Sequence, residues 1–283
     1  MSSVATKILY ISEELAMYSY FLLFIIGVIG NLSNILVFTC IKAFRRNHSA
    51  FYLITLSISN CGLLLMTLPF RLTEITFTND TTRTSRIWCK IRVMIAYTFA
   101  LTSVSWTCFA AIDQYLSTNH DPRLRQMSTL KLAHRLVYSS IIISIVYDCL
   151  FLFLFDSKPI TVCAVYNHYF ANYLSFFHLI ILIGIIPIFI SSIFSVLAYL
   201  NVRRIIQLRM QALQRKLEMQ LTAMVLANVA LFVVTTIHAI VFRIYLLHVT
   251  VMSGDSLRFA IYQLISCISY GLSFINPAVC CYT

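Results

Sequence analysis

Long apolar runs separated by short polar segments dominate the pattern along the chain. Residues 15–41, 50–70 and 93–112 contain no charged residue, and residues 136–155 contain only Asp148. Charge is also absent from residues 159–202, 219–242 and 259–283. About 20 mainly apolar residues cross a bilayer as a helix, and lipid offers an irregular backbone no hydrogen-bond partner. The pattern therefore predicts seven transmembrane helices.

The run at 159–202 is too long for one crossing, so we expect its first part to be a loop. The prediction is an all-α membrane protein, a seven-transmembrane helix bundle forming one domain over residues 1–283. Its helices are expected near 15–41, 50–72, 89–117, 134–155, 173–205, 212–246 and 257–283. The N-terminus lacks the pattern of a cleaved signal peptide, so we expect the first helix to be the retained insertion signal.

Composition excludes an ordinary soluble domain. The chain has 60% hydrophobic and 11% charged residues, whereas soluble domains carry roughly 25% charged residues. A net charge of +11 raises the possibility of nucleic-acid binding, but the basic residues lie between apolar runs and form no basic domain. We therefore expect no nucleic-acid partner and interpret the basic excess as contact with membrane lipids.

The distribution of basic residues predicts the orientation. If the N-terminus is outside, the inner loops hold twelve of the 21 Lys and Arg residues, including Arg45, Arg125 and Arg203. Cytoplasmic loops carry the excess of Lys and Arg in multi-pass proteins. We accordingly expect an outside N-terminus and a location in the plasma membrane.

Polar and small residues recur at particular places within the runs. They are Gly30, Asn31 and Asn34 in the first, Asn60 and Pro69 in the second, Cys89 and Asp113-Gln114-Tyr115 at the ends of the third, Pro187 in the fifth and Asn276-Pro277 in the seventh. In order and spacing this set resembles the landmarks of rhodopsin-like (class A) G-protein-coupled receptors, in a diverged form similar to invertebrate peptide receptors. The resemblance implies a non-enzymatic receptor, without a cofactor, that passes an extracellular peptide or small-molecule signal to a heterotrimeric G protein.

The same resemblance implies a disulfide between Cys89 and Cys163, which ties the third helix to the second outer loop. Asn79 opens an Asn-Asp-Thr sequence in the first outer loop, where it is either glycosylated or bare. Cys280 and Cys281 near the inner face either carry palmitate or are small lipid-facing side chains.

Four interior residues stand where the family clusters its central polar network. They are Asn31, Asn60, Ser103 and Asn276. The resemblance implies a sodium site there, normally built around an Asp of the second helix. Asn60 supplies a carbonyl oxygen but no charge, so we expect weak or absent sodium binding. The alternative is a purely structural network that joins helices one, two and seven.

The residues that correspond to the family's activation switch depart from its pattern. Gln114 replaces the central Arg, so it can hydrogen-bond to Glu218 but cannot form the family's ion pair. Asp113 is then expected to pair with Arg123 or Arg125. The resemblance implies that the switch and the G-protein contact are formed by Asp113, Gln114, Tyr115, Glu218, Phe232, Asn276 and Pro277. His238 and Cys280 stand where the family has its helix-six Pro and its helix-seven Tyr.

The ligand site is expected in the outer half of the bundle. Ala96 stands where amine receptors carry an Asp, so a small cationic amine is not expected. The resemblance instead places Tyr97, Arg243, Gln263, Ser266 and Tyr270 around the site, with Glu74 at its rim. Such an aromatic cavity with one or two charges suits a peptide or another small molecule. Alternatively, the side chain of Arg243 extends to the membrane interface.

Other seven-helix functions are less well supported. A transporter or channel needs paired acids or a charged lane, and Asp148 is the one clear mid-membrane carboxylate. His178 and His238 have no accompanying His/Asp cluster at metal-ligand spacing, so we expect no metal site. The altered switch leaves open a degenerate receptor that folds but does not couple.

Overall fold

The structure is a computed structural model that describes residues 3–41, 47–76, 86–155, 165, 167–205, 212–248 and 256–279. Its helices are α1 (Ser3–Cys40), α3 (His48–Thr76), α5 (Arg86–Ser117), α6 (Pro122–Met127), α7 (Leu130–Asp148), α8 (Phe151–Leu154), α9 (His168–Asn172), η1 (Tyr173–Ile185), α10 (Ile186–Ile205), α11 (Ala212–His248), α12 (Ser256–Ser273) and α13 (Ile275–Val279).

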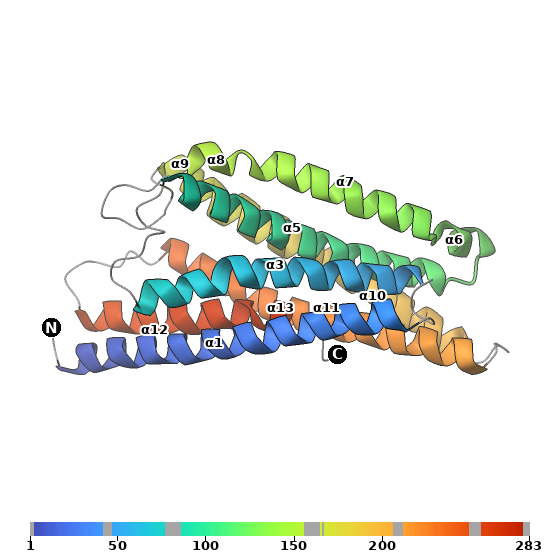
Figure 1. Ribbon diagram of the computed structural model, residues 1–283, viewed down its shortest axis with the longest axis horizontal. Helices are drawn as coiled ribbons and strands as arrows, with labels where there is room; N and C mark the ends of the chain where they lie inside the picture. Colours follow the sequence, from blue (N-terminus) through green and yellow to red (C-terminus); the bar gives the residue numbers. More distant parts are fainter. Residues whose placement is uncertain are drawn as a thin grey trace.

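These helices form one elongated bundle in which seven segments are long and apolar enough to cross a membrane, counted over the described residues (Figure 1). The fourth segment joins α7 to α8, the fifth runs from α9 through η1 into α10, and the seventh joins α12 to α13. In the centre, α3 packs against α1 and α5, and α5 packs also against α7 and α10. The predicted seven-helix bundle is confirmed.

Helix ends differ from the predicted boundaries where a helix continues beyond its apolar run. We predicted a start near residue 15, but α1 begins at Ser3 and includes Lys7, Glu13 and Glu14. A charge-free run marks the part of a helix that fits the hydrocarbon, whereas the helix itself needs only satisfied backbone hydrogen bonds.

The fifth crossing is the least regular of the described helices. Its first half, η1, is a π-helix of 13 residues. Pro187 follows in α10 and has no N–H to donate, and Ile186 before it donates to the carbonyl of Ile181. Wide helical turns of this kind are rare and often lie at functional sites, and η1 borders the cavity described below.

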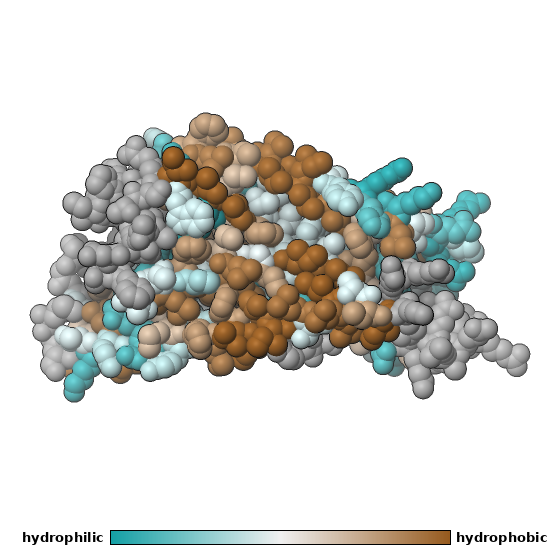
Figure 2. Space-filling view, in the orientation of Figure 1, coloured by the Kyte–Doolittle hydropathy of each residue, from teal (hydrophilic) through white to brown (hydrophobic). Residues whose placement is uncertain are grey.

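Large apolar side chains cover the outside of the bundle. Ile142, Val146 and Phe189 are each more than 60% exposed. Figure 2 shows hydrophobic side chains along the middle of one face, with hydrophilic ones gathered towards its ends. A soluble domain would bury this surface, so its exposure fits a chain whose solvent is lipid.

The interior packs in separate clusters at different depths. The largest, around Trp106, joins α3, α5, α7 and α11 near the end of the bundle opposite the N-terminus. A second, around Tyr20 and Leu64, joins α1, α3 and the seventh crossing. A third, around Phe151 and Phe170, lies near the N-terminal end. The cavity lies between the second and third clusters, bordered by residues of α3, α5, η1 and α11.

Gly27 allows α1 to approach the seventh crossing closely. A Cβ at this position would lie 2.6 Å from Cδ1 of Leu64 and 3.0 Å from the Cα of Ala278. Since backbone cannot move aside as a side chain can, we expect Gly27→Ala to lower the free energy of unfolding by roughly 1–3 kcal/mol. Gly271→Ala is the control, because its nearest neighbour would be Cε1 of Tyr20 at 3.4 Å. Equal melting temperatures for the two variants would contradict this account.

Candidate functional site

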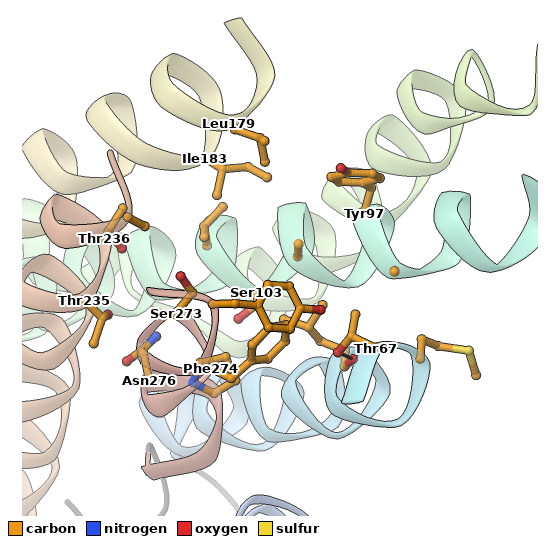
Figure 3. Close-up of a pocket in the computed structure, with 18 of the residues that line it drawn as sticks. Thr67, Tyr97, Ser103, Leu179, Ile183, Thr235, Thr236, Ser273, Phe274 and Asn276 are labelled. Atoms are coloured by element: carbon orange, nitrogen blue, oxygen red, sulfur yellow. Dashed lines mark hydrogen bonds between the residues drawn. The ribbon is translucent and has the colours of Figure 1, made fainter. Parts of the chain in front are cut away.

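A cavity of about 420 Å³ opens between α3, α5, η1, α11 and the seventh crossing. Ligand pockets in proteins span roughly 300–1,000 Å³, so this cavity has the size for a small organic ligand. Figure 3 shows Tyr97, Leu179 and Ile183 along one side and Ser273, Phe274 and Asn276 along the other. Five elements distant in sequence, together with Phe155 after α8, therefore contribute to one site.

Charged side chains gather at the cavity end that lies nearer the N-terminus. Arg71 and Glu74 come from the last turns of α3, Arg92 from the first turns of α5 and Arg243 from the last turns of α11. Nη1 of Arg71 lies 2.9 Å from Oε2 of Glu74, and Nη2 of Arg92 lies 3.9 Å from its Oε1. One carboxylate thus lies between two guanidinium groups.

Aromatic rings hold two of these arginines in place. The guanidinium of Arg71 lies 4.9 Å from the ring centroid of Tyr270, and that of Arg92 lies 4.8 Å from the ring centroid of Phe70. Cation–π contacts of this kind stabilise an arginine by roughly 0.5–2 kcal/mol, more where water is excluded. The ring contacts therefore hold both arginines in defined positions.

The deep end of the cavity carries polar groups beside an aromatic floor. Ser103, Phe232, Asn276 and Pro277 line it. Phe232 is 4% exposed and packs with Leu101 and Val104 of α5. The cavity therefore reaches from the charged end to the residues that the resemblance assigns to switching.

Four of the six expected ligand-site residues line this cavity: Glu74, Tyr97, Arg243 and Tyr270. Gln263 and Ser266 are not among its lining residues. On α12, Ser266 precedes Tyr270 by one helical turn and Gln263 by two, and the α12 part of the lining begins at Tyr270. Their assignment to the ligand site therefore stays a prediction from the resemblance.

Sequence reasoning missed Arg71 and Arg92. Both follow landmarks that it did identify: Arg71 lies two residues after Pro69, and Arg92 three residues after Cys89. An arginine near the end of an apolar run normally extends to the interface. Only the packing of α3 against α5 shows that these two face inward.

The central polar residues bond to one another across three crossings. Nδ2 of Asn31 donates to the carbonyl oxygens of Gly27 at 2.7 Å and Pro277 at 2.8 Å. The hydroxyl of Ser103 donates to Oδ1 of Asn60 at 2.7 Å. Asn31 and Asn60 are both fully buried. These bonds join α1 to α13 and α3 to α5.

We expect this network to bind no sodium. The carbonyl oxygen of Asn60 already accepts from Ser103, and an uncompensated buried cation is costly. Exchanging sodium for potassium should leave the melting temperature unchanged, whereas an Asn60→Asp variant should gain a sodium-dependent rise. A sodium-dependent rise in the unmodified chain would contradict the prediction.

Asp113 bonds to partners that the sequence did not reveal. Its Oδ2 accepts from the hydroxyl of Ser49 at 2.8 Å and lies 2.7 Å from Nδ1 of His48. Its Oδ1 accepts from the hydroxyl of Ser128 at 2.5 Å. These contacts tie the start of α3 and the segment before α7 to the end of α5.

The expected pairing of Asp113 with Arg123 or Arg125 is wrong. Both arginines are exposed on the short helix α6. Asp121 caps the start of that helix by accepting from the backbone N–H of Arg123. The cap holds α6 with both arginines facing solvent. The carboxylate of Asp113 instead contacts His48 and the two serines.

Gln114 contacts the sixth crossing through a neutral residue. Its side chain is 3% exposed, and its Nε2 donates to Oγ1 of Thr222 on α11. Glu218 lies one turn earlier on α11, and its side chain falls outside the described residues. On the neighbouring face of α5, the ring of Tyr115 lies 5.5 Å from that of Phe194 on α10.

Several expected features lie wholly or partly outside the described residues. Cys89 is buried and disulfide-bonded, but Cys163 lies outside, as do Asn79, Cys280 and Cys281. Among the described residues, no group of three or more His, Cys, Asp or Glu is placed to hold a metal ion. His178 lies 3.2 Å from the hydroxyl of Tyr147, and His238 lies 3.2 Å from that of Ser269.

Comparison with known proteins gives a match over most of the chain. The model for 7-transmembrane receptors of the rhodopsin family matches residues 30–279. This span includes all seven membrane-length helices at least in part and every lining residue of the cavity.

Individual relatives match over shorter stretches. Lysophosphatidic acid receptor 6 of Homo sapiens is 32% identical over 96 residues, or 34% of this chain and 27% of the receptor. The probable G-protein coupled receptor 34 of Pan troglodytes is 31% identical over 113 residues, or 40% of this chain and 29% of that protein. The matched stretches thus span less than a third of either relative.

Proposed function

Because the chain belongs to the rhodopsin family of seven-transmembrane receptors, we propose that it transmits the binding of an extracellular ligand to a heterotrimeric G protein. The N-terminus then lies outside and the chain resides in the plasma membrane as a multi-pass protein. The excess of Lys and Arg in the loops at the opposite end supports this orientation. From here on, the N-terminal end of the bundle is called the outer end.

One observation carries the proposal: a single cavity connects the outer end to Phe232, Asn276 and Pro277. A ligand in it touches α11 and the seventh crossing at once. A ligand shifts an equilibrium between two helix packings only by its differential contacts with them. Contact with both crossings provides such a difference, so ligand binding can change their relative position.

The ligand is proposed to be a peptide or another small molecule. The relative from Homo sapiens is named for lysophosphatidic acid, an acidic lipid. The cavity lining holds three arginines and one glutamate, so acidic groups suit it better than basic ones. An acidic peptide and a small acidic molecule both satisfy this condition.

The altered switch favours one alternative, a receptor that folds without coupling. Gln114 carries no charge where the family has Arg, and its described contact is Thr222. A transporter is less well supported, because it needs paired acids or a charged lane, and Asp148 is a single carboxylate fully buried at the end of α7.

The test is G-protein activation in cells that express the chain and, separately, a Gln114→Arg variant. Basal activity and responses to panels of peptides and acidic lipids are measured against surface expression. Activation above cells that lack the chain supports coupling. Surface expression with no activation by either variant identifies a non-coupling receptor, and ion currents instead would indicate a channel.

The contact between Gln114 and Thr222 is expected to favour the resting packing of α5 against α11. A Thr222→Val variant keeps the shape but removes the acceptor. One hydrogen bond contributes roughly 0.5–1.5 kcal/mol, so basal G-protein activation should rise about two- to tenfold. The control is Thr39→Val, since Thr39 is exposed on α1 and bonds within its own helix. Equal basal activities would argue against a resting contact here.

A further inference from the structure

Ser128 follows two arginines in the sequence and contacts Asp113 in the structure. Arg123 and Arg125 stand five and three residues before it. Protein kinases select their substrates largely by the charge pattern around the acceptor hydroxyl. Basic residues at these two places are the pattern that arginine-directed serine kinases select. The sequence around Ser128 is therefore that of a phosphate acceptor.

The structure distinguishes Ser128 from a second serine that follows an arginine at the same spacing. Arg46 lies three residues before Ser49, but Ser49 is 3% exposed in the first turn of α3. Ser128 is half-buried, and its two neighbours in the chain, Met127 and Thr129, are both exposed. A kinase can therefore reach the segment around Ser128, whereas Ser49 is held inside the bundle.

Helix α6 can open locally at low cost. It has six residues, none of them buried, and Ser128 closes it by donating its backbone N–H to the carbonyl of Arg125 at 3.3 Å. Kinases bind the acceptor segment in an extended form, so α6 has to unwind before the phosphate is transferred. Segments with few buried contacts open far more easily than the whole fold does. The short helix can therefore present Ser128 to a kinase while the bundle stays folded.

The hydroxyl of Ser128 belongs to the polar cluster at the end of α5. It donates to Oδ1 of Asp113 at 2.5 Å and lies 3.1 Å from Nδ1 of His48. A phosphate on the same oxygen removes the donated proton and adds a charge of about −2 beside the carboxylate. Repulsion between like charges then replaces the hydrogen bond between Ser128 and Asp113.

The arginines that precede Ser128 offer the phosphate another partner. Both are exposed on α6. Arg125 is three residues from Ser128, so the two side chains can meet across one helical turn. Guanidinium groups pair with phosphate through charge-assisted hydrogen bonds. A phosphate on Ser128 therefore favours a side-chain position near Arg125 over the present one beside Asp113.

We propose that Ser128 is a phosphorylation site that controls the contact between α5 and the segment before α7. The inference rests on the proposed orientation, which places this end of the bundle in the cytosol with protein kinases and ATP. A kinase transfers the γ-phosphoryl group of ATP to Oγ of Ser128. The bond from the γ-phosphorus to the bridging oxygen breaks, ADP leaves with that electron pair, and the hydroxyl proton passes to the catalytic base of the kinase.

Phosphorylation changes which elements Asp113 joins. His48 and Ser49 remain as its partners, and both belong to α3. Asp113 then still joins α5 to α3 but no longer to the segment between α6 and α7. This segment lies beside Asp113-Gln114-Tyr115, which the proposed function assigns to G-protein contact. The modification therefore regulates the inner face of the bundle without occupying its ligand cavity.

The first test labels the purified full chain, in phosphatidylcholine nanodiscs, with an arginine-directed serine kinase and γ-labelled ATP. We expect the label on Ser128, located by mass spectrometry of the phosphopeptides, and Ser128→Ala should remove it. Arg125→Gln should lower the initial rate roughly tenfold or more, because a charge-assisted contact with the kinase is lost. Thr129→Asn is the matched control, since it deletes the neighbouring hydroxyl but keeps a side chain that can cap α7.

Three labelling results would overturn the site. They are a label on Thr129 or Ser49 in place of Ser128, no label at all, and an undiminished rate for Arg125→Gln. The Ser128 phosphopeptide is also expected from intact cells that express the chain. If the purified chain were labelled but cells with an active kinase never yielded this peptide, Ser128 would lie outside the cytosol and the proposal would fail.

The second test measures the repulsion at Asp113 through melting temperatures. Ser128→Ala removes the donor, whereas Ser128→Glu also adds a negative charge, so the Glu variant should melt at the lower temperature. In an Asp113→Asn background the two variants should melt alike, because the repulsion is gone. A Glu variant at least as stable as the Ala variant, or a difference that persists beside Asn, would overturn the electrostatic account.

Both tests are independent of G-protein coupling. The expected labelling and melting in a chain that activates no G protein would support the site and reject coupling. G-protein activation by a chain that takes no label on Ser128 would support the receptor function and reject the site.

Discussion

Replacing Asp113 with alanine is expected to lower the free energy of unfolding by about 3–5 kcal/mol, because its carboxylate accepts two hydroxyl hydrogen bonds that each contribute roughly 1.5–3 kcal/mol when the acceptor is charged. Asp113 is 6% exposed and contacts His48, Ser49 and Ser128. Without the carboxylate, these three groups lose a shared acceptor, and the start of α3 is no longer tied to the end of α5. The melting temperature of the purified chain, measured in one detergent throughout, checks the result.

Single alanine variants of the loop arginines provide the control for this prediction. Arg123→Ala and Arg125→Ala remove exposed side chains and should change the melting temperature little. The cap of α6 survives in Arg123→Ala, because Asp121 accepts from the backbone. If either arginine variant lowered the melting temperature as much as Asp113→Ala does, the arginines of α6 would be the partners of Asp113. The contacts with His48, Ser49 and Ser128 would then not explain its contribution to stability.

Replacing Phe232 with alanine is expected to have the second large effect, a destabilisation of roughly 3–5 kcal/mol as for other buried aromatic residues. Phe232 packs with Leu101 and Val104 at the floor of the cavity. The variant enlarges the cavity at the point where a ligand would contact α11. A ligand-stimulated signal should therefore fall further than surface expression does, because the contact that moves α11 is lost.

Val234→Ala is the matched control on the same helix, since Val234 is 68% exposed and faces away from the cavity. Melting temperature, surface expression and stimulated G-protein activation are measured for both variants. A Phe232→Ala variant with normal stability and a normal stimulated signal would show that Phe232 contributes neither to core stability nor to switching.

Much of the bundle could be predicted from the sequence because its cause is local. Seven apolar runs of membrane length require helices in lipid whatever their neighbours are. The landmarks from Asn31 to Pro277 likewise lie within single runs, and the match over residues 30–279 confirms the family they indicated. Helix ends were predicted less well, as for α1, since hydrophobicity reports membrane depth and not where the hydrogen bonding stops.

The candidate site could be predicted only in part. The family resemblance placed Tyr97 and Tyr270 in the ligand site, and both line the cavity. The resemblance did not give the depth at which the cavity ends, and it also named Gln263 and Ser266, which do not line the cavity. Depth depends on how far neighbouring helices approach, which no single run encodes.

The sequence by itself therefore determined the number of crossings, their apolar lengths and the family. Only the tertiary structure decided which polar side chains meet: Asp113 with His48, Gln114 with Thr222, and Glu74 with Arg71 and Arg92. The physical reason is the separation along the chain of the residues that each property involves. Apolar length is a property of one continuous run of about 20 residues, whereas an ion pair or hydrogen bond needs its atoms within about 3–4 Å. That distance is set by the packing of helices far apart in the chain.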